Sequence, residues 1–341
     1  MSSPKRILFS ANDPGGANAI LPVIEMLIVR GDRCEGYLTG PARDIFARRG
    51  IPFIDAEGVP HQKIEEDIDA FSPDVFVASR SIGVTIDKYL LLMMRKRSVR
   101  SVYVLDFWSA YKESVWDARD PFYYLPDAYC VMDDLARDEM LAEGFPPETL
   151  RVTGNPHFEH FTEGITCDNE DPHEILFISQ PIRSDLGALY GFDEFSALRG
   201  LIEAVDPLPE EYHICVRLHP RDELGKFDDM LSTRVTLSKA QTLEEALSGA
   251  GLIVSPFSQV LIQARAAGKS VISFQPDAQA PDPLPTNRLG LTAKASTVGE
   301  LRGLLDRYAG GEPVAAQIDI EKLWPKGAAD SIMKVIDLLS K

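Results

Sequence analysis

The chain has 341 residues, of which 45% are hydrophobic and 26% are charged. This composition is typical of a folded globular protein and excludes a largely disordered chain. Asp and Glu number 52 against 35 Lys and Arg, which gives a formal net charge of −17. Such a negative field repels the phosphates of DNA and RNA, so we expect no nucleic-acid partner.

No segment combines the features of an export signal, and the longest apolar stretches fall short of the roughly 20 residues that a membrane span needs. Four cysteines are present without CxxC spacing: Cys34, Cys130, Cys167 and Cys215. We therefore expect free thiols in a reducing compartment, and neither a zinc site nor disulfides. Together these features predict a cytoplasmic protein with no transmembrane segment, no metal and no other cofactor.

Short apolar runs alternate with amphipathic runs along the first half of the chain. The first run, RILFSA at residues 6–11, has the composition of a buried strand, and a helical pattern follows it from 16 to 31. Further strands are expected at 33–40, 73–80, 101–108, 127–132 and 150–155, and further helices at 42–50, 87–97 and 133–145. This alternation predicts βαβ units, and hence a parallel sheet with helices on both faces.

The segment FTEGITCDNEDP, residues 161–172, is polar and rich in turn-forming residues, which indicates a linker. After it, strands are expected at 174–179, 212–218, 234–238, 251–255 and 270–274, and helices at 193–205, 242–251, 258–268, 297–311 and 329–341. The predicted fold class is α/β, with two doubly wound, Rossmann-like domains facing a cleft. We place the first domain at 1–160, the second at 173–325, and a C-terminal helix that packs back on the first at 326–341.

Two segments that follow strands of the second domain carry residue types that bind anions. VRLHPRDE places His219 between Arg217 and Arg221, and the proline after the histidine disfavours helix at that point. In SPFSQVLIQARAAG, Ser255 ends a strand and Ser258 stands where a residue caps the next helix. Each segment alone is equally compatible with a solvated turn or an ordinary cap. Two of them at neighbouring strand ends predict a phosphate site.

The turn SANDPGGANAI joins the first strand to the first helix. Gly15 and Gly16 allow backbone amides to approach a ligand closely, and Asn18 adds a polar side chain near the helix start. Asp13 is suited either to capping the helix or to acting as a base. A tight turn without a ligand explains the segment equally well. The dinucleotide-binding pattern GxGxxG is absent, so NAD is not expected.

The order of strand, HP, strand, serines and the helix QARAAGKSVI resembles the donor half of GT-B nucleotide-sugar enzymes. It is most similar to CDP-glycerol glycerophosphotransferases and bacterial polysialyltransferases, and VTGNP, residues 152–156, also resembles a segment of non-hydrolysing UDP-GlcNAc 2-epimerases. The resemblance covers residues 150–280 or so. It implies that His219, Ser255 and Ser258 hold the phosphates of a nucleotide-activated donor, and that Asn155 lies near the domain junction.

The sequence departs from the family pattern at two points. Gln263 stands where many of these enzymes carry a glutamate that holds the ribose hydroxyls, and the Ser-Gly-Gly of the epimerases is absent. The second departure favours a transferase over an epimerase. Gln259 belongs to the same donor-binding segment, while Gln180 and Arg183, which follow the first strand of the second domain, are expected to meet the donor or the acceptor.

A transferase needs a base that activates the acceptor hydroxyl. Asp13 is the first candidate, and Asp106 is the second because it follows a strand and precedes aromatic residues that either stack on a sugar or pack in the core. His219 would neutralise charge on the leaving phosphate. We thus predict transfer of a sugar or polyol phosphate to a glycan or lipid-linked acceptor in surface glycan synthesis. The alternatives are a nucleotide-sugar 2-epimerase and a non-catalytic protein that binds a nucleotide or sugar.

Overall fold

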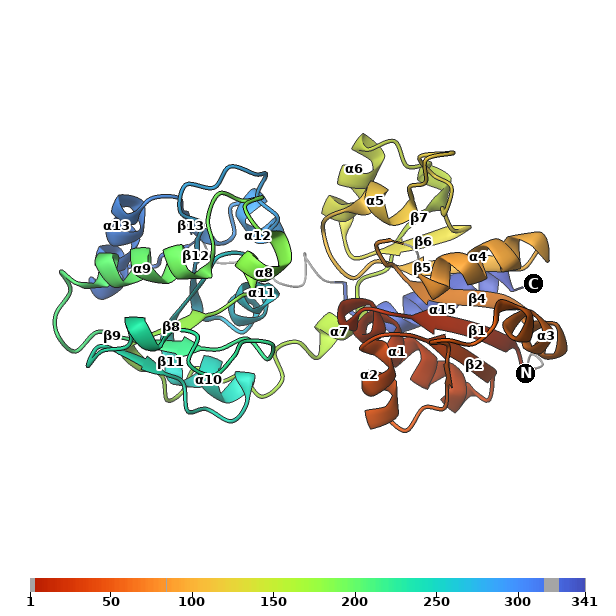
Figure 1. Cartoon of the computed structure of the whole chain (residues 1–341), viewed down its shortest axis with the longest axis horizontal. Coiled ribbons are helices and arrows are strands. Elements are labelled where there is room, and N and C mark those ends of the chain that lie inside the picture. The colour runs from red at the N-terminus through yellow and green to blue at the C-terminus, as the bar shows by residue number, and fades with distance from the viewer. Residues whose placement is uncertain (1–3, 84, 316–324, 341) are drawn as a thin grey trace. The chain divides into compact units, whose positions relative to one another are not determined.

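The structure is a computed structural model that describes residues 4–83, 85–315 and 325–340. These residues fall into two compact units. The first unit contains the elements from β1 to α7 together with the C-terminal helix α15, and the second contains those from β8 to α13 (Figure 1).

The first unit is built on a sheet of seven parallel strands in the order β3-β2-β1-β4-β5-β6-β7. The strands are β1 Arg6–Ala11, β2 Arg33–Leu38, β3 Ile54–Asp55, β4 Val75–Ser79, β5 Arg100–Val104, β6 Ala128–Val131 and β7 Leu150–Val152. The helices are α1 Pro14–Arg30, α2 Ala42–Arg48, α3 His61–Phe71, α4 Ile86–Lys96, α5 Tyr111–Val115, α6 Asp134–Ala142, α7 Pro156–Glu159 and α15 Ala328–Leu339, with a 3-10 turn at Pro147–Thr149. The strand order reverses between β1 and β4.

Helix α15 belongs to the core of the first unit although it is the last element of the chain. Its Ile332 and Ile336 are fully buried in the same hydrophobic cluster as Ile7 and Phe9 of β1. Asp337 of this helix also accepts a hydrogen bond of 2.7 Å from the Lys5 ammonium. The C-terminal helix therefore covers the sheet on which the chain begins.

The second unit contains a sheet of six parallel strands in the order β10-β9-β8-β11-β12-β13. The strands are β8 Asp171–Ile178, β9 His213–Arg217, β10 Val235–Leu237, β11 Ala250–Ser255, β12 Ser270–Phe274 and β13 Ala293–Ala295. The helices are α8 Ile182–Leu186, α9 Glu194–Val205, α10 Leu243–Gly249, α11 Gln259–Ala266, α12 Pro285–Arg288 and α13 Val298–Ala309, with a 3-10 turn at Asp228–Met230. In both sheets the order in which strands are added reverses once, as in a Rossmann fold. The prediction of two doubly wound α/β units is therefore confirmed.

The segment interpreted as a linker has contacts of its own. The amide of Thr166 donates a 3.0 Å hydrogen bond to Ser248 Oγ at the end of α10, and β8 begins at Asp171, within the segment. Residues 161–170 therefore pack on the second unit before its first strand. Their polar composition reflects exposure, which a packed surface segment and a free linker share.

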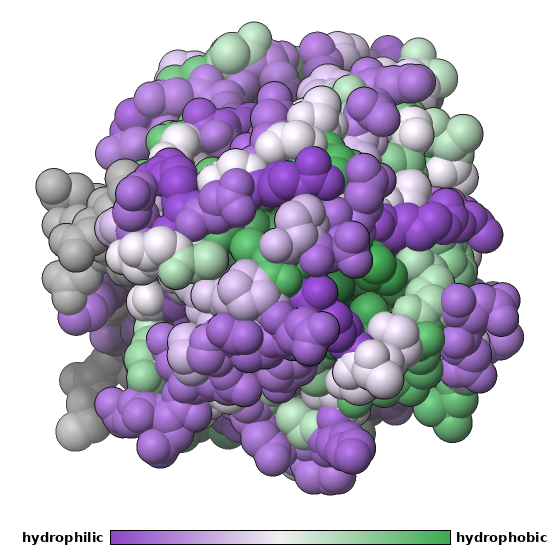
Figure 2. Space-filling view, turned by 90° about the vertical axis from the view of Figure 1, so that its left-hand side faces the viewer, coloured by the Kyte–Doolittle hydropathy of each residue, from purple (hydrophilic) through white to green (hydrophobic). Residues whose placement is uncertain are grey.

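The surface of the molecule is largely polar where Figure 2 shows it, with smaller hydrophobic areas between hydrophilic side chains. Among residues 4–83, 85–315 and 325–340, no helix has the length and apolar character that crossing a bilayer requires. Within the same ranges, no three His, Cys, Asp or Glu side chains gather in the way that a metal site requires.

Candidate functional site

The first candidate site lies where the sheet of the first unit reverses direction. In parallel sheets ligands bind outside the carboxyl ends of the strands at such a point. Asp13 follows β1, Arg80 follows β4 and Asp106 follows β5, so three charged side chains are placed at this edge. The Arg80 guanidinium donates from Nε to Asp106 Oδ1 at 2.8 Å, and both side chains are nearly buried.

The two carboxylates interact electrostatically. Burial, and next the negative charge of Asp106, raise the pKa of Asp13, while a 2.9 Å hydrogen bond from Asn12 Nδ2 and the charge of Arg80 oppose the shift. Asp13 occupies the N-cap position of α1, yet no helix amide in the described part of the chain donates to its side chain. The structure therefore does not use the side chain of Asp13 as a helix cap, and this carboxyl, with its raised pKa, lies at the carboxyl edge of the sheet.

Two glycines allow the start of α1 to approach Asp106 and the end of β4 closely. A Cβ on Gly15 would lie 2.4 Å from Asp106 Oδ2, and a Cβ on Gly16 would lie 2.3 Å from Ser79 Oγ. Both distances are far below ordinary contact, so the close approach of the helix requires glycine at each position. Asn18, predicted beside them, is half-buried one turn further along the helix.

Arg80 was not among the residues singled out from the sequence. Its Nη1 donates to the carbonyl oxygens of Ser109 and Ala110, the latter at 3.3 Å, in addition to the bond from Nε to Asp106. The side chain thus fixes the loop between β5 and α5 against the end of β4. The available signal was an arginine directly after the five buried residues of β4, close to the position that Asp13 has two residues after β1.

The aromatic residues after β5 pack in the core. Trp108 is 3% exposed, stacks on Phe158 with ring centres 5.4 Å apart, and donates from Nε1 to Asp133 at 2.8 Å. Tyr111 is buried and donates to a glutamate of α6. Of the two alternatives for these residues, core packing is correct. Asn155 is also buried, and its side chain caps α7.

The second candidate site lies at the corresponding edge of the second unit. Ser255 ends β11, and its buried hydroxyl donates to the Ile178 carbonyl at 2.9 Å. The Gln180 side chain, directly after β8, accepts from the Phe257 amide at 2.9 Å and so fixes the turn after β11. Ser258 caps α11 by accepting from the amide of the residue two further along. The helix start and its outward amides are thereby positioned at the edge of the sheet.

The HP segment forms a turn after β9, at the same edge. The His219 amide donates to Asp222 Oδ2 at 2.9 Å, and the Arg221 amide donates to His219 Nδ1 at 3.2 Å. Burial and the neighbouring Arg221 lower the pKa of His219, which favours the neutral ring. An imidazole whose Nδ1 accepts carries its proton on Nε2. His219 therefore presents one N–H donor from a defined ring nitrogen.

The three arginines predicted at the donor site, Arg183, Arg217 and Arg221, are bound to protein groups. Arg221 pairs with Asp185, with Nη1 3.1 Å from Oδ1, and Arg183 donates from Nε to Asp193 at 2.8 Å. Arg217 donates to a backbone carbonyl of the loop before α10. Each arginine is thus engaged within the unit, and the positive charge facing a ligand is smaller than the sequence suggested. Two of the predicted glutamines are on α11: Gln259 is its first residue, and Gln263 is buried.

Comparison with known proteins gives a match at the level of the fold. No family model and no curated protein sequence matches the chain. The UDP-GlcNAc 2-epimerase of Neisseria meningitidis, solved with UDP-GlcNAc bound, is similar with a TM-score of 0.67 and 15% identity over 98% of this chain and 100% of that one. The UDP-GlcNAc 2-epimerase of Methanocaldococcus jannaschii has a TM-score of 0.65 with 14% identity, over 97% of this chain and 99% of that one.

A lipopolysaccharide outer core galactosyltransferase in its apo form is similar over 97% of this chain and 99% of that one, with a TM-score of 0.62 and 14% identity. Epimerases and a glycosyltransferase thus match the chain over nearly its whole length. The sheet orders of the two units agree with this similarity. The chain therefore has the GT-B fold, with two Rossmann-like units in tandem.

Proposed function

We propose that this protein is a nucleotide-sugar enzyme that transfers a sugar or polyol phosphate from a nucleotide-activated donor to an acceptor hydroxyl. One observation carries the proposal. Two consecutive residues at the carboxyl end of β8 hold the two anion-suited turns on either side of it: Ser179 donates to Asp222 at 2.7 Å, and Gln180 accepts from Phe257 at 2.9 Å. The two turns that were singled out from the sequence are therefore neighbours, joined through β8.

The donor phosphates are assigned to this pair of turns. Nε2–H of His219 donates to one phosphate oxygen, and the amides at the start of α11, beside the Ser258 hydroxyl, receive another. Fixed donors of this kind stabilise the charge that develops on a leaving phosphate. No bound cation is required for that step, since the imidazole and the helix dipole supply the donors.

Asp13 is assigned as the base for the acceptor hydroxyl. Its pKa is raised by burial and by Asp106, so its carboxylate holds a proton more readily than an exposed aspartate does. A general base works best when its pKa approaches the working pH, and a raised carboxyl pKa moves in that direction. Asp106, held by Arg80, acts on the reaction through the pKa of Asp13.

The donor site is tested by thermal unfolding in the presence of CMP, CDP, UDP, GDP and their sugar conjugates. A ligand at about 100 times its dissociation constant stabilises the folded state by about 2.7 kcal/mol, which is a shift of several degrees. We expect one nucleotide to give this shift and His219→Ala to lose it. His173→Ala, at the opposite end of β8, is the matched control and should keep it. No shift with any nucleotide would contradict the proposal.

A nucleotide-sugar 2-epimerase is the second candidate, because UDP-GlcNAc 2-epimerases are among the structures similar to this chain and one was solved with UDP-GlcNAc bound. Epimerisation removes and returns a proton on the sugar ring and needs no acceptor. Incubation of the protein with UDP-GlcNAc alone in deuterium oxide would place deuterium on the epimerised carbon. A transferase leaves that carbon unlabelled.

A further inference from the structure

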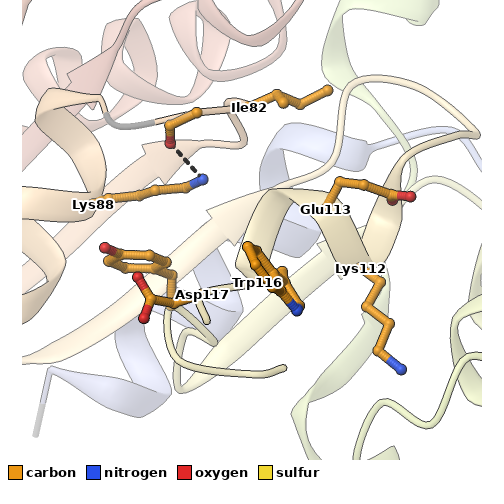
Figure 3. Close-up of a pocket in the computed structure, with 8 residues that line it drawn as sticks. Ile82, Lys88, Lys112, Glu113, Trp116 and Asp117 are labelled. Carbon is orange, nitrogen blue, oxygen red and sulfur yellow. Dashed lines mark hydrogen bonds between the residues drawn. The ribbon is translucent and has the colours of Figure 1, made fainter. Parts of the chain in front are cut away.

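A cavity of about 590 Å³ opens in the first unit (Figure 3). It lies between the loop after β4, which contributes Ile82, the first turns of α4, which contribute Lys88, and the stretch from α5 to Tyr124. Its volume falls within the range of about 300–1,000 Å³ that small-molecule sites have. The residues that were expected to bind a ligand do not line it.

Two large apolar side chains in the cavity wall are exposed to solvent. Trp116, directly after α5, is 53% exposed, and Ile82 is 57% exposed. Trp108, by contrast, is buried against Phe158. An indole left uncovered in a concave wall offers a flat apolar face of the kind that stacks on the C–H face of a sugar ring. Figure 3 shows the Trp116 indole between Lys88 and Glu113.

Polar groups of both signs complete the wall. Lys88 is almost fully buried; its ammonium donates to the Gly83 carbonyl at 2.7 Å and lies 5.2 Å from the centre of the Tyr124 ring. Glu113 adds a carboxylate, and Asp117 is paired with a neighbouring arginine. The wall holds two lysines, Lys88 and Lys112, and two carboxylates, Glu113 and Asp117. Because their formal charges cancel, the cavity does not suit a polyanion such as a nucleotide. It suits a neutral ligand with one apolar face and hydroxyl groups around its edge.

Arg80 connects segments of the cavity wall to Asp106. Ile82 follows Arg80 by two residues, and the same guanidinium binds Asp106 and the carbonyl of Ala110, directly before α5. Helix α5 carries Glu113 of the cavity wall. The buried Arg80 side chain therefore links this wall to Asp106. The cavity is therefore on the carboxyl side of the sheet, where Asp13 also lies.

We propose that this cavity binds a pyranose ring of the acceptor. The apolar face of the ring stacks on Trp116 and Ile82, one ring hydroxyl accepts from the Lys88 ammonium, and another donates to Glu113. Naming this ring as the acceptor rests on the proposed function, whereas binding of a pyranose in the cavity does not. The ligand class is a neutral hexopyranoside.

The test is saturation-transfer NMR on the whole protein with methyl glycosides of glucose, galactose, mannose and N-acetylglucosamine. We expect at least one glycoside to bind with its ring C–H protons most strongly saturated. Trp116→Ala should weaken this binding roughly tenfold, and Trp116→Phe should restore part of it. Val29→Ala is the matched control, because Val29 is an exposed apolar residue of the same unit, outside the cavity wall, and should leave binding unchanged.

A thermal-shift titration with nucleotides, run on the same variants, separates the two proposals. Glycoside binding that depends on Trp116, with nucleotide binding unchanged in Trp116→Ala, supports the inference. If no methyl glycoside binds, or if binding is equal in Trp116→Ala, the inference is overturned while the nucleotide result still tests the proposed function. Weaker nucleotide binding in Trp116→Ala would assign the cavity to the donor and overturn the inference. Glycoside binding without any nucleotide binding would overturn the acceptor role.

Discussion

Replacing Gly15 by alanine should displace the Asp106 carboxylate, which interacts electrostatically with Asp13. Gly15 is the second residue of α1, and a Cβ there would lie 2.4 Å from Asp106 Oδ2, where ordinary contact begins at 3.4 Å. The alanine therefore displaces the Asp106 carboxylate by about 1 Å if α1 stays in place. A movement of that size breaks the 2.8 Å bond from Arg80 to Asp106.

Two effects of opposite sign compete in this variant. Alanine in place of glycine within a helix stabilises the fold by about 0.5–1 kcal/mol. Loss of a buried hydrogen bond between charged groups costs about 1.5–3 kcal/mol. The second effect is larger, and we expect Gly15→Ala to lower the free energy of unfolding by about 1.5 kcal/mol, or about 3–6 °C in Tm. Turnover should fall further, by about 100-fold, because a 1 Å displacement at a reacting group has that effect.

The assay is thermal unfolding followed by circular dichroism, together with donor turnover. Gly303→Ala is the matched control, since Gly303 lies inside α13 and no described atom outside the helix backbone comes within 4 Å of its Cβ position. The control should gain about 0.5–1 kcal/mol and keep full turnover. A Gly15→Ala protein as stable and active as Gly303→Ala would refute the reasoning, because it would show that Asp106 moves at no cost.

Three further predictions concern charged groups. Asp106→Asn removes a charge that raises the pKa of Asp13, so the acidic limb of the pH–rate profile should move to lower pH; an unmoved limb would contradict the coupling. Burial raises the pKa of Asp133 from 3.8 to about 6. The native state then binds more protons than the unfolded state between these values, and the chain loses about 3 kcal/mol of stability as pH rises through that window. Urea unfolding at pH 4.5 and 7.5 should show about 2 kcal/mol of this loss in the wild type that Asp133→Asn does not show, and equal losses in both would refute it. Lys269 is fully buried and donates to Glu170 and two backbone carbonyls, so Lys269→Met should cost about 1–3 kcal/mol in guanidinium unfolding of the second unit, whereas a neutral result would show that these acceptors find other donors.

The sheets were predictable because buried parallel strands are continuous apolar runs. Val75–Ser79 and Ala250–Ser255 are buried at every position, and each was recognised from its sequence. Of the four strands at the sheet edges, β7 and β10 were recognised, whereas β3 and β13 were not. Ile54–Asp55 has two residues and Ala293–Ala295 has three, with an exposed residue in each. Strands so short have no periodicity of their own, and their pairing depends on a neighbour far along the chain.

The site was predictable only where a residue follows a buried strand within two positions. Asp13 and Asp106 have this position and were singled out, yet Arg80 has it as well and was overlooked, because its partners are 26 to 30 residues away and meet it only through the strand order. Trp108 and Trp116 show a second limit. Trp108 lies before α5 and is buried by contacts with Phe158 and Asp133, whereas Trp116 lies after α5 and is exposed, and the sequence alone does not distinguish the two indoles.

The environments of Asp13 and Asp106 assign them different roles under the proposed function. Asp106 is held in a nearly buried pair by Arg80, and that guanidinium also fixes the loop before α5. The Asp106 carboxylate is therefore already bound by a guanidinium within the unit. Asp13 accepts from one neutral amide, Asn12, and its pKa is raised by burial and by the charge of Asp106. Under the proposed function Asp13 is therefore assigned as the proton acceptor, and Asp106 as the charge that raises its pKa.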